Sequence, residues 1–447
     1  MTKNKYYLSG SDWVISALDY MMKKTTCSGN MSQVVFALES AADHALLESR
    51  LSRFAKELPV LRGNVARNFK YNFAPYWRIP ENAKADSEIN LHYAENHSFP
   101  DNILPSLEKS ANRQFKNENE HISFNLIRAD NKKSFFAMAF DHRLLDARGA
   151  EAFFNLFEQY LTGNCERSIL EGILPTSPSG LSEWMKKFRA GRNVNRKLIA
   201  LSETAPESLP IPAEKNRGFR FRVITFGPEE TGLIYDNACR EAGYLMEMPY
   251  LLAVVIQSVR GFFEKRGLPV SSFLIPVSVD MRGGGDIKQK LFFNHISYLF
   301  FQISAGNMDS LKGLINSLKL QMYEQVRSGL PGDLAEASFL TRIAPLPVLG
   351  KLLCLPFKGK MASFVFSHLG KSSYLSSEFT GCKVENIFHM PRVPVPPGLG
   401  FFFNYFNGKL NLVISYIEGL IEDAEVSALE KDIKERLVYI KGNEQII

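Results

Sequence analysis

The sequence of residues 135–157 is FFAMAFDHRLLDARGAEAFFNLF, and it changes from a strand pattern to a helix pattern across one short turn. Phe135–Phe140 is mostly apolar and follows polar residues, which predicts a buried strand. From Ala147 onward apolar side chains recur at every third and fourth position, which predicts an amphipathic helix. The turn between them carries His142 and Asp146 with HxxxD spacing. We expect the strand end to let the imidazole face an interior cavity.

A histidine in such a turn is suited to proton transfer. Its unperturbed pKa lies near neutral pH, so His142 can take a proton from an alcohol, amine or thiol and return it to a leaving group. A carboxylate at Asp146 can orient the imidazole, or it can pair with an arginine that holds the turn rigid. The alternative is that His142 is a core histidine donating to a carbonyl, because a short motif is only a hypothesis without its context.

The composition is that of an ordinary folded protein. The chain has 447 residues, 45% of them hydrophobic and 22% charged, which suggests two or three core-forming units. Its net charge of +6 favours anionic ligands, while no dense basic stripe interleaved with aromatics indicates nucleic acid. The five scattered cysteines lack CxxC spacing and are typical of reduced thiols. With no secretory signal and no run of about 18 apolar residues, we expect a cytoplasmic location.

Both halves of the chain show strands alternating with helices, and a linker separates them. Residues 202–218 are rich in Pro, Ser, Ala and Glu, so we expect them to divide an N-terminal lobe, residues 1–201, from a C-terminal lobe, residues 219–447. The dipeptide Asn407-Gly408 predicts a β-hairpin near the C-terminus. The predicted fold class is α/β (α+β), with a mixed sheet and helices in each lobe.

Three stretches of the second half support a resemblance that begins with HRLLD. They are IPVSVDMR at Ile275–Arg282, Asn294 within LFFNHIS, and FVFSHLG at Phe364–Gly370. Together with HRLLD they resemble the chloramphenicol acetyltransferase-like superfamily, in its monomeric two-lobed branch of condensation domains, alcohol acyltransferases and wax-ester-synthase-like enzymes. The resemblance covers about residues 20–420, and His368 stands where that family usually has asparagine.

Two positions depart from the family pattern HHxxxDG. Asp141 stands at the first histidine and Ala147 at the glycine. A similar DHRxxD occurs in dihydrolipoyl acyltransferases, but there it lies near the C-terminus of a chain with lipoyl modules, which this sequence lacks. Asp141 keeps open an alternative in which the protein is catalytically degenerate and only binds carrier proteins or lipids.

The resemblance implies a two-lobed V with a central channel and His142 midway along it. A thioester donor, either acyl-CoA or an acyl-carrier protein, would enter from one side and a hydroxyl or amine acceptor from the other. His142 would deprotonate the acceptor and then protonate the leaving thiolate. Asp146 would be mostly structural and would pair with an arginine. Arg282 is our candidate, and the alternative is a surface arginine that closes a strand.

The remaining site residues are candidates for binding the oxyanion. They are the backbone amides of Arg148-Gly149 and the side chains of Asn294 and Ser367. We expect no metal and no permanently bound cofactor, because the acyl-CoA or phosphopantetheine-linked donor is a substrate. The expected activity is ester- or amide-forming acyl transfer, and the competing enzyme is a condensation enzyme with both substrates on carrier proteins.

One segment raises the question of a membrane contact. Residues 346–361 mix Leu, Val and Phe with three lysines, so they either rest on a membrane surface or bind a lipid acyl chain, or form a helix packed on the second lobe. The basic residues 181–202 that precede the linker are predicted to be a solvated helix face.

Overall fold

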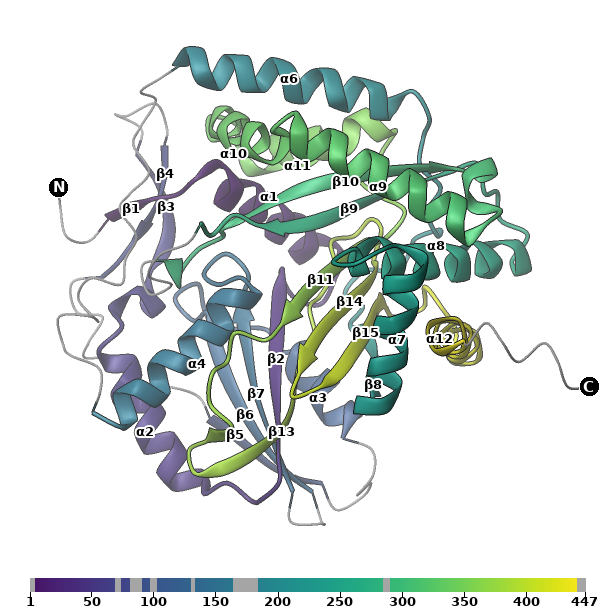
Figure 1. Cartoon of the computed structure of the whole chain (residues 1–447). Coiled ribbons are helices and arrows are strands. Elements are labelled where there is room, and N and C mark those ends of the chain that lie inside the picture. The colour runs from purple at the N-terminus through teal and green to yellow at the C-terminus, as the bar shows by residue number, and fades with distance from the viewer. Residues whose placement is uncertain are drawn as a thin grey trace, which may run out of the picture.

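The computed structural model describes residues 5–68, 74–80, 91–96, 103–129, 133–163, 184–283 and 290–439. In these ranges the chain forms two six-stranded mixed sheets and one three-stranded sheet, with helices packed around them (Figure 1). Both large sheets mix parallel and antiparallel strands, as the predicted fold class requires. No helix in this part of the chain is long and apolar enough to cross a lipid bilayer.

The first large sheet carries the HRLLD motif. Its strands, in order across the sheet, are β12 (Glu378–Phe379), β13 (Cys382–His389), β2 (Met31–Leu38), β7 (Ser134–Asp141), β6 (Ile122–Ala129) and β5 (Leu91–Asn96). The central strands β2 and β7 are buried along nearly their whole length, which explains why most of their residues are apolar.

The second large sheet lies entirely in the second half of the chain. Its strands, in order, are β10 (Ile296–Ser304), β9 (Ser272–Asp280), β11 (Val365–Lys371), β14 (Leu399–Phe406), β15 (Lys409–Ile417) and β8 (Phe219–Phe226). β11 runs parallel to both neighbours, and the other pairs are antiparallel. β14 and β15 form the hairpin predicted at Asn407-Gly408. A small third sheet contains β1 (Lys5–Tyr7), β4 (Ala74–Arg78) and β3 (Asn64–Asn68).

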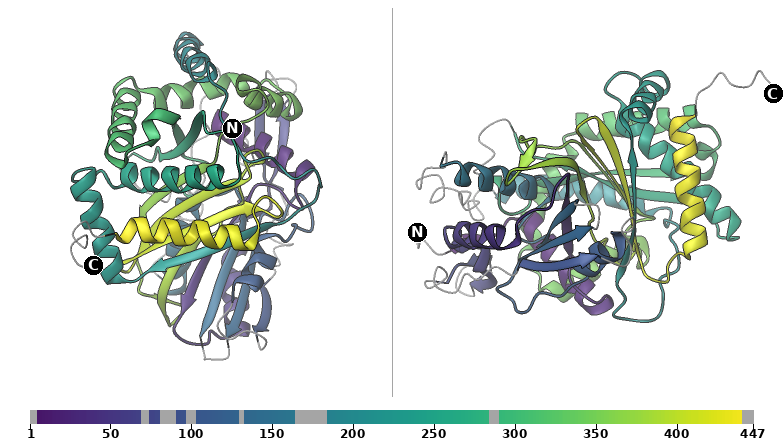
Figure 2. Two further views of the ribbon diagram at one scale, coloured as in Figure 1. Left: turned by 90° about the vertical axis from the view of Figure 1, so that its right-hand side faces the viewer. Right: turned by 90° about the horizontal axis from the view of Figure 1, so that it is seen from below.

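Helices cover both large sheets. Those of the first half are α1 (Gly10–Thr25), α2 (His44–Lys56), α3 (Leu104–Ala111), α4 (Ala147–Leu161) and α6 (Trp184–Ser202), with the 3-10 turn η1 (Pro59–Arg62). Those of the second half are α7 (Pro228–Glu241), α8 (Glu247–Lys265), α9 (Leu311–Arg327), α10 (Leu330–Thr341), α11 (Leu346–Cys354) and α12 (Asp423–Val438), with 3-10 turns η3 (Ala305–Met308) and η4 (Leu355–Phe357). Figure 2 shows α12 and α7 lying across one face of the second sheet.

The aromatic side chains of α4 fix the helix on the first sheet. Phe154 packs edge-on against Phe36 of β2, with ring centroids 4.8 Å apart, and against Phe136 of β7 at 5.7 Å. Each buried phenylalanine of this kind contributes roughly 1.5–3 kcal/mol relative to an exposed one. The turn between β7 and α4 is therefore held at both ends by buried elements.

The two halves of the chain share the first sheet. Its strands β12 and β13 come from the second half, and β13 pairs antiparallel with β2. In addition, α6 packs on α10, and α1 packs on α10 and α11. The division into an N-terminal lobe, residues 1–201, and a C-terminal lobe, residues 219–447, remains a prediction. The structure shows in addition that β13 and several helices pack against the other half of the chain.

Buried asparagines connect the two large sheets where β13 meets β14 and β15. Asn386 Nδ2 donates to Asn411 Oδ1 at 2.8 Å, and Asn411 Nδ2 donates back to Asn386 Oδ1 at 3.0 Å. Asn404 Nδ2 donates to the carbonyl of Ile387 at 2.8 Å. Because buried amides are costly without partners, this reciprocal pairing favours one alignment of the sheets.

We expect Asn411→Ala to lower the free energy of unfolding by about 1–3 kcal/mol, because it removes both bonds to the buried amide of Asn386. The double variant Asn386→Ala/Asn411→Ala should cost less than the sum of the single changes, since both orphaned groups are then gone. Urea denaturation measures each value, and Asn195→Ala on exposed α6 is the control. Additive single changes would show that the amide pair is not coupled.

Candidate active site

Asp146 ends the HRLLD turn and starts α4. Its Oδ1 accepts a hydrogen bond from the Gly149 amide at 2.8 Å, which makes Asp146 the N-cap of the helix. A Cβ on Gly149 would lie 2.3 Å from the carbonyl oxygen of Leu291, so only glycine permits this close approach. The Gly149 amide thus donates to Asp146. Its expected role in binding an oxyanion stays a prediction.

A buried ion pair joins the turn to the second half of the chain. Arg282, just beyond β9, donates from Nη2 to Asp146 Oδ1 at 2.6 Å, and the His295 amide donates to Oδ2 at 3.1 Å. Both charged side chains are almost fully buried. Burial alone would raise the pKa of Asp146, but Arg282 and the amide donors hold that pKa below its usual value. Of the two roles considered for Asp146, the structure shows pairing with arginine.

The segment beside the turn has a strained backbone. The Phe293 amide donates to the Leu144 carbonyl at 2.7 Å, and Phe293 adopts a φ of +69°, a left-handed conformation that costs a bulky residue about 1–3 kcal/mol. Its ring stacks on Tyr6 with centroids 4.2 Å apart. Packing therefore holds Phe293 in this conformation and fixes the next residue, Asn294, beside the turn.

Asn294 determines which nitrogen of His142 carries the proton. Its Nδ2 donates to the His142 carbonyl at 2.9 Å and lies 3.4 Å from Asp12 Oδ1, so its NH₂ group faces two acceptors. Its Oδ1 then faces His142 Nδ1 at 3.0 Å, and Nδ1 must donate. Nε2 is left with a free lone pair and makes no hydrogen bond to any residue of the described ranges. The imidazole is therefore in the tautomer of a general base.

Asp12 supports this arrangement from α1. Its Oδ2 accepts from the backbone amide and hydroxyl of Ser9 at 2.8 and 2.7 Å, in a capping box at the start of the helix. Its Oδ1 accepts from the Asn294 amide at 2.9 Å. Asp12 was not predicted as a site residue, although the SxxD spacing before an amphipathic helix signals the cap.

Asp141, which replaces the first histidine of the family pattern, belongs to a separate buried cluster. Its Oδ2 lies 2.9 Å from His121 Nδ1 and accepts from Arg143 Nη2 at 2.6 Å. Burial would raise the pKa of Asp141, but Arg143 and His121 hold that pKa well below its usual range. Asp141 is therefore a carboxylate with charged partners of its own, and it leaves the His142–Asn294 pair intact.

Glu151 of α4 is a second buried carboxylate that joins three elements. It accepts from His389 Nε2 at 3.1 Å, Arg148 Nη1 at 2.9 Å and the Ser373 amide at 2.7 Å. Burial would raise the pKa of Glu151, but His389 and Arg148 lower it to about 2. Arg148 also donates to the carbonyl of Lys371 at 2.7 Å. The start of α4 is thus tied to both β11 and β13, and no motif in the sequence signals these contacts.

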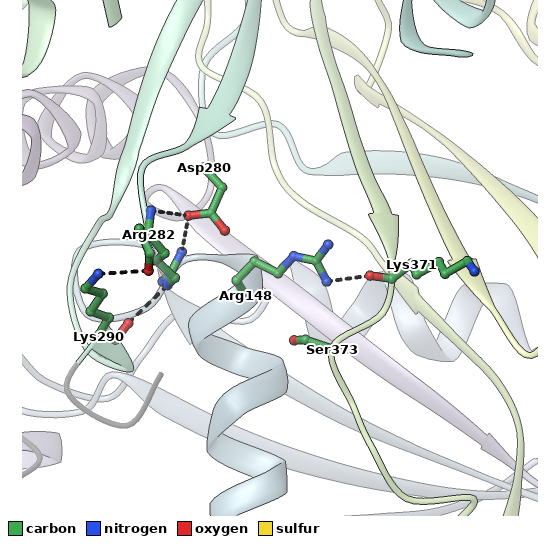
Figure 3. Close-up of a pocket in the computed structure, with 7 residues that line it drawn as sticks. Arg148, Asp280, Arg282, Lys290, Lys371 and Ser373 are labelled. Carbon is green, nitrogen blue, oxygen red and sulfur yellow. Dashed lines mark hydrogen bonds and ion pairs between the residues drawn. The ribbon is translucent and has the colours of Figure 1, made fainter. Parts of the chain in front are cut away.

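A basic pocket opens beside these ion pairs (Figure 3). Its volume is about 340 Å³. The residues that line it are Arg148, Asp280, Arg282, Gly283, Lys290, Lys371 and Ser373. Lys290 Nζ has no carboxylate partner in the described part of the chain and donates only to the Gly283 carbonyl at 3.2 Å. Figure 3 shows the Lys371 side chain directed away from Arg148. The pocket has the charge to hold an anion.

Ser367 and the neighbouring His368, both in the second sheet, have other partners than His142. Ser367 of β11 shares a hydrogen bond of 2.9 Å with Ser278 of β9. The neighbouring His368 lies 3.9 Å from Glu247, and burial, aided by Arg148, lowers the pKa of this histidine to about 4. Hydrogen bonds thus join His142 to Asn294, and Asp146 to Arg282 and Gly149. Among the described residues Ser367 makes no hydrogen bond to these five. No described group of three or more His, Cys, Asp or Glu residues could hold a metal ion.

Solved structures with a similar architecture include an acetyltransferase and condensation domains. Trichothecene 15-O-acetyltransferase from Fusarium sporotrichioides aligns with a TM-score of 0.71 at 14% identity, over 97% of this chain and 95% of that one. The first condensation domain of the CDA synthetase aligns with a TM-score of 0.64 at 12% identity, over 97% and 96%. This chain has the chloramphenicol acetyltransferase-like fold.

The fold predicted from HRLLD and its companion stretches is thereby confirmed. The starter condensation domain of rhizomide synthetase, solved with C8-CoA and Leu-SNAC, also aligns, with a TM-score of 0.62 at 12% identity over 97% of this chain and 94% of that one. The sequence itself matches no protein-family model and no curated protein. The two-lobed fold is thus shared at a level of identity that establishes architecture alone.

Glu151→Gln should make the protein less sensitive to acid. Because the pKa of Glu151 is about 2 in the folded state and 4.5 ordinarily, its charge stabilises the fold above about pH 4.5, and this contribution is lost as the pH falls toward 2. We expect the variant to be about 3 kcal/mol less stable at neutral pH, with the gap closing near pH 2.

Urea denaturation at a series of pH values measures this gap. Glu158→Gln on the same helix is the control, because burial raises the pKa of Glu158 and its charge does not stabilise the fold. A Glu151→Gln gap that stays constant from neutral pH to pH 2 would contradict an ionised Glu151.

Proposed function

We propose that this protein is an acyltransferase that moves an acyl group from a thioester donor to a hydroxyl or amine, with His142 as general base. The hydrogen bond from His142 Nδ1 to Asn294 Oδ1 carries the proposal, because it leaves Nε2 unprotonated. The fold shared with acyltransferases and condensation domains supports the reaction class.

In the proposed reaction, Nε2 takes the proton of the acceptor as its oxygen or nitrogen attacks the thioester carbonyl. The tetrahedral intermediate then collapses, the carbon–sulfur bond breaks, and Nε2 returns the proton to the leaving thiolate. While the imidazole is charged, Asn294 Oδ1 stabilises Nδ1–H. Holding both substrates together supplies much of the rate, so no acyl-enzyme and no bound cofactor is required.

Existing hydrogen bonds reduce the number of candidate donors for the oxyanion. The Gly149 amide donates to Asp146, and the Asn294 amide group donates to the His142 carbonyl. The Ser367 hydroxyl is bonded to another hydroxyl, either of which can be the donor. We therefore retain the Ser367 hydroxyl and the Arg148 backbone amide as candidate oxyanion donors of the proposed mechanism, and we assign Asn294 to positioning His142.

The basic pocket supports a donor that carries phosphate. Both acyl-CoA and a phosphopantetheine arm do so, and the pocket lies beside the Asp146–Arg282 pair that ends the HRLLD turn. One structural neighbour was solved with C8-CoA. We propose acyl-CoA as the donor, with a carrier-bound thioester as the second candidate.

The direct test measures thiol release from a panel of acyl-CoAs with mixed alcohol and amine acceptors. We expect His142→Ala to lower kcat by about 10²- to 10⁴-fold, the usual contribution of a general base. Asn294→Ala should lower kcat while leaving KM largely unchanged, and His44→Ala on α2 is the matched control.

The other outcomes separate the alternatives. Acceptor-dependent release that persists in His142→Ala would disprove His142 as the base. If no CoA supports release, carrier-protein donors are tested next, because a condensation enzyme takes both substrates in that form. Failure of these donors as well would favour a protein that only binds carriers or lipids.

Lys290→Glu should raise KM for acyl-CoA by about fivefold or more with little change in kcat, because it reverses an ammonium charge in the pocket. Lys312→Glu is the matched control, since it reverses an exposed charge on α9 that is not among the residues lining the pocket. Steady-state kinetics compares the two. Equal effects of both variants would show that overall charge, and not this pocket, attracts the donor.

A further inference from the structure

All charged residues of helix α6 are basic, and the helix lies at the outside of the molecule. Figure 1 shows it above α10, at one extremity of the fold. Its nineteen residues contain six cations, which are Lys186, Lys187, Arg189, Arg192, Arg196 and Lys197. No acidic residue occurs in the helix, and Glu203 is the first to follow it. A helix surface with this charge pattern attracts anionic partners.

The inner side of α6 is already occupied. Lys186 Nζ pairs with Glu336 of α10 at 2.6 Å, and the buried Lys187 lies 3.8 Å from the same carboxylate. Leu201 packs against Phe357 of η4 in a small apolar cluster. The segment predicted as a solvated helix face is therefore solvated on one side only, and its position on α10 is fixed.

The side of α6 that faces solvent combines cations with apolar groups. Its exposed residues recur at three- and four-residue spacing, which places them on one helix face. We call this face the outer stripe, and it consists of Met185, Phe188, Arg189, Arg192, Arg196 and Ile199. Among the residues that the structure describes, none of its three arginines has a carboxylate partner.

Large apolar side chains stand at both ends of the outer stripe. At one end Met185 is 79% exposed, and Trp184 stacks on Phe188 with centroids 5.5 Å apart. At the other end Ile199 is 58% exposed, and η4, which packs against α6, carries Leu355 at 71% exposure. Exposed apolar groups of this size mark an interaction surface.

We propose that the outer stripe binds the surface of a lipid bilayer with anionic headgroups. A basic helix with aromatic and aliphatic side chains on its free face lies in the membrane interface, where arginines reach phosphates and apolar groups enter the acyl boundary. Nineteen helical residues span about 28 Å, so apolar groups at both ends fit a flat, extended partner better than a small globular one. The inference is independent of the proposed acyl transfer.

Co-sedimentation of the full-length protein with vesicles tests the proposal. We expect binding to vesicles of phosphatidylcholine with phosphatidylserine, weak binding to phosphatidylcholine alone, and weaker binding as salt is raised. The triple variant Arg189→Glu/Arg192→Glu/Arg196→Glu should bind on the order of 100-fold more weakly, since each basic residue near an anionic surface contributes roughly a factor of five.

A matched variant separates a local surface from overall charge. Lys312→Glu/Lys431→Glu/Lys434→Glu reverses three exposed charges on α9 and α12 and changes the net charge by the same amount. It should bind anionic vesicles nearly as wild type does. Both variants should melt as wild type does, because neither set of side chains is buried.

Tryptophan fluorescence gives a second readout. Of the three tryptophans, Trp13 and Trp77 are buried, so Trp184 is the exposed one. Its emission should shift to shorter wavelength when anionic vesicles are added. Trp184→Phe should abolish the shift but still sediment with the vesicles.

Three results would overturn the proposal. They are equal binding to neutral and anionic vesicles, absence of binding to either, and binding that the arginine variant retains. If vesicles do not bind but the arginine variant loses transfer from carrier-protein donors and keeps it from acyl-CoA, the outer stripe is a docking face for an acidic protein instead.

Discussion

The buried ion pair between Asp146 and Arg282 is the constraint on which the site depends. It joins the turn after β7 to the end of strand β9. If the two large sheets moved apart near His142, a buried charge would lose its partner, which is costly. Next to this pair, the Phe293 amide donates a hydrogen bond to the Leu144 carbonyl. The following residue, Asn294, is thereby placed within hydrogen-bond distance of the His142 imidazole. The tautomer of the histidine is thus a consequence of how the two halves of the chain are fastened together.

The local part of this arrangement can be predicted from sequence. The change from apolar run to helical spacing locates the turn of HRLLD, and the resemblance to a known fold brings Arg282 and Asn294 to its side. What each does is less accessible. Asn294 was considered as an oxyanion donor, whereas its hydrogen bonds in the structure hold His142. Residue type and order along the chain predict which residues lie near the site. They do not predict which hydrogen bonds each residue makes, because these depend on the folded backbone.

The unpredicted residues are those that long-range packing brings in. Asp12 reaches the site from α1, and Glu151 gathers His389 and Arg148 from elements that are far apart in the chain. Neither Asp12 nor Glu151 belongs to a motif that predicts these hydrogen bonds. Likewise, β13 was not predicted, and its sequence does not indicate which sheet it enters, because the reciprocal hydrogen bonds of Asn386 and Asn411 form only after assembly.

The pairing of β13 with β2 bears on how the chain folds as it is synthesised. The first sheet receives this strand, at Cys382–His389, only after most of the polypeptide has left the ribosome. Until then β2 presents an unpaired edge, and unpaired edges of apolar strands promote aggregation. A nascent or truncated chain that ends before β13 therefore lacks the strand that covers this edge of β2 in the complete fold.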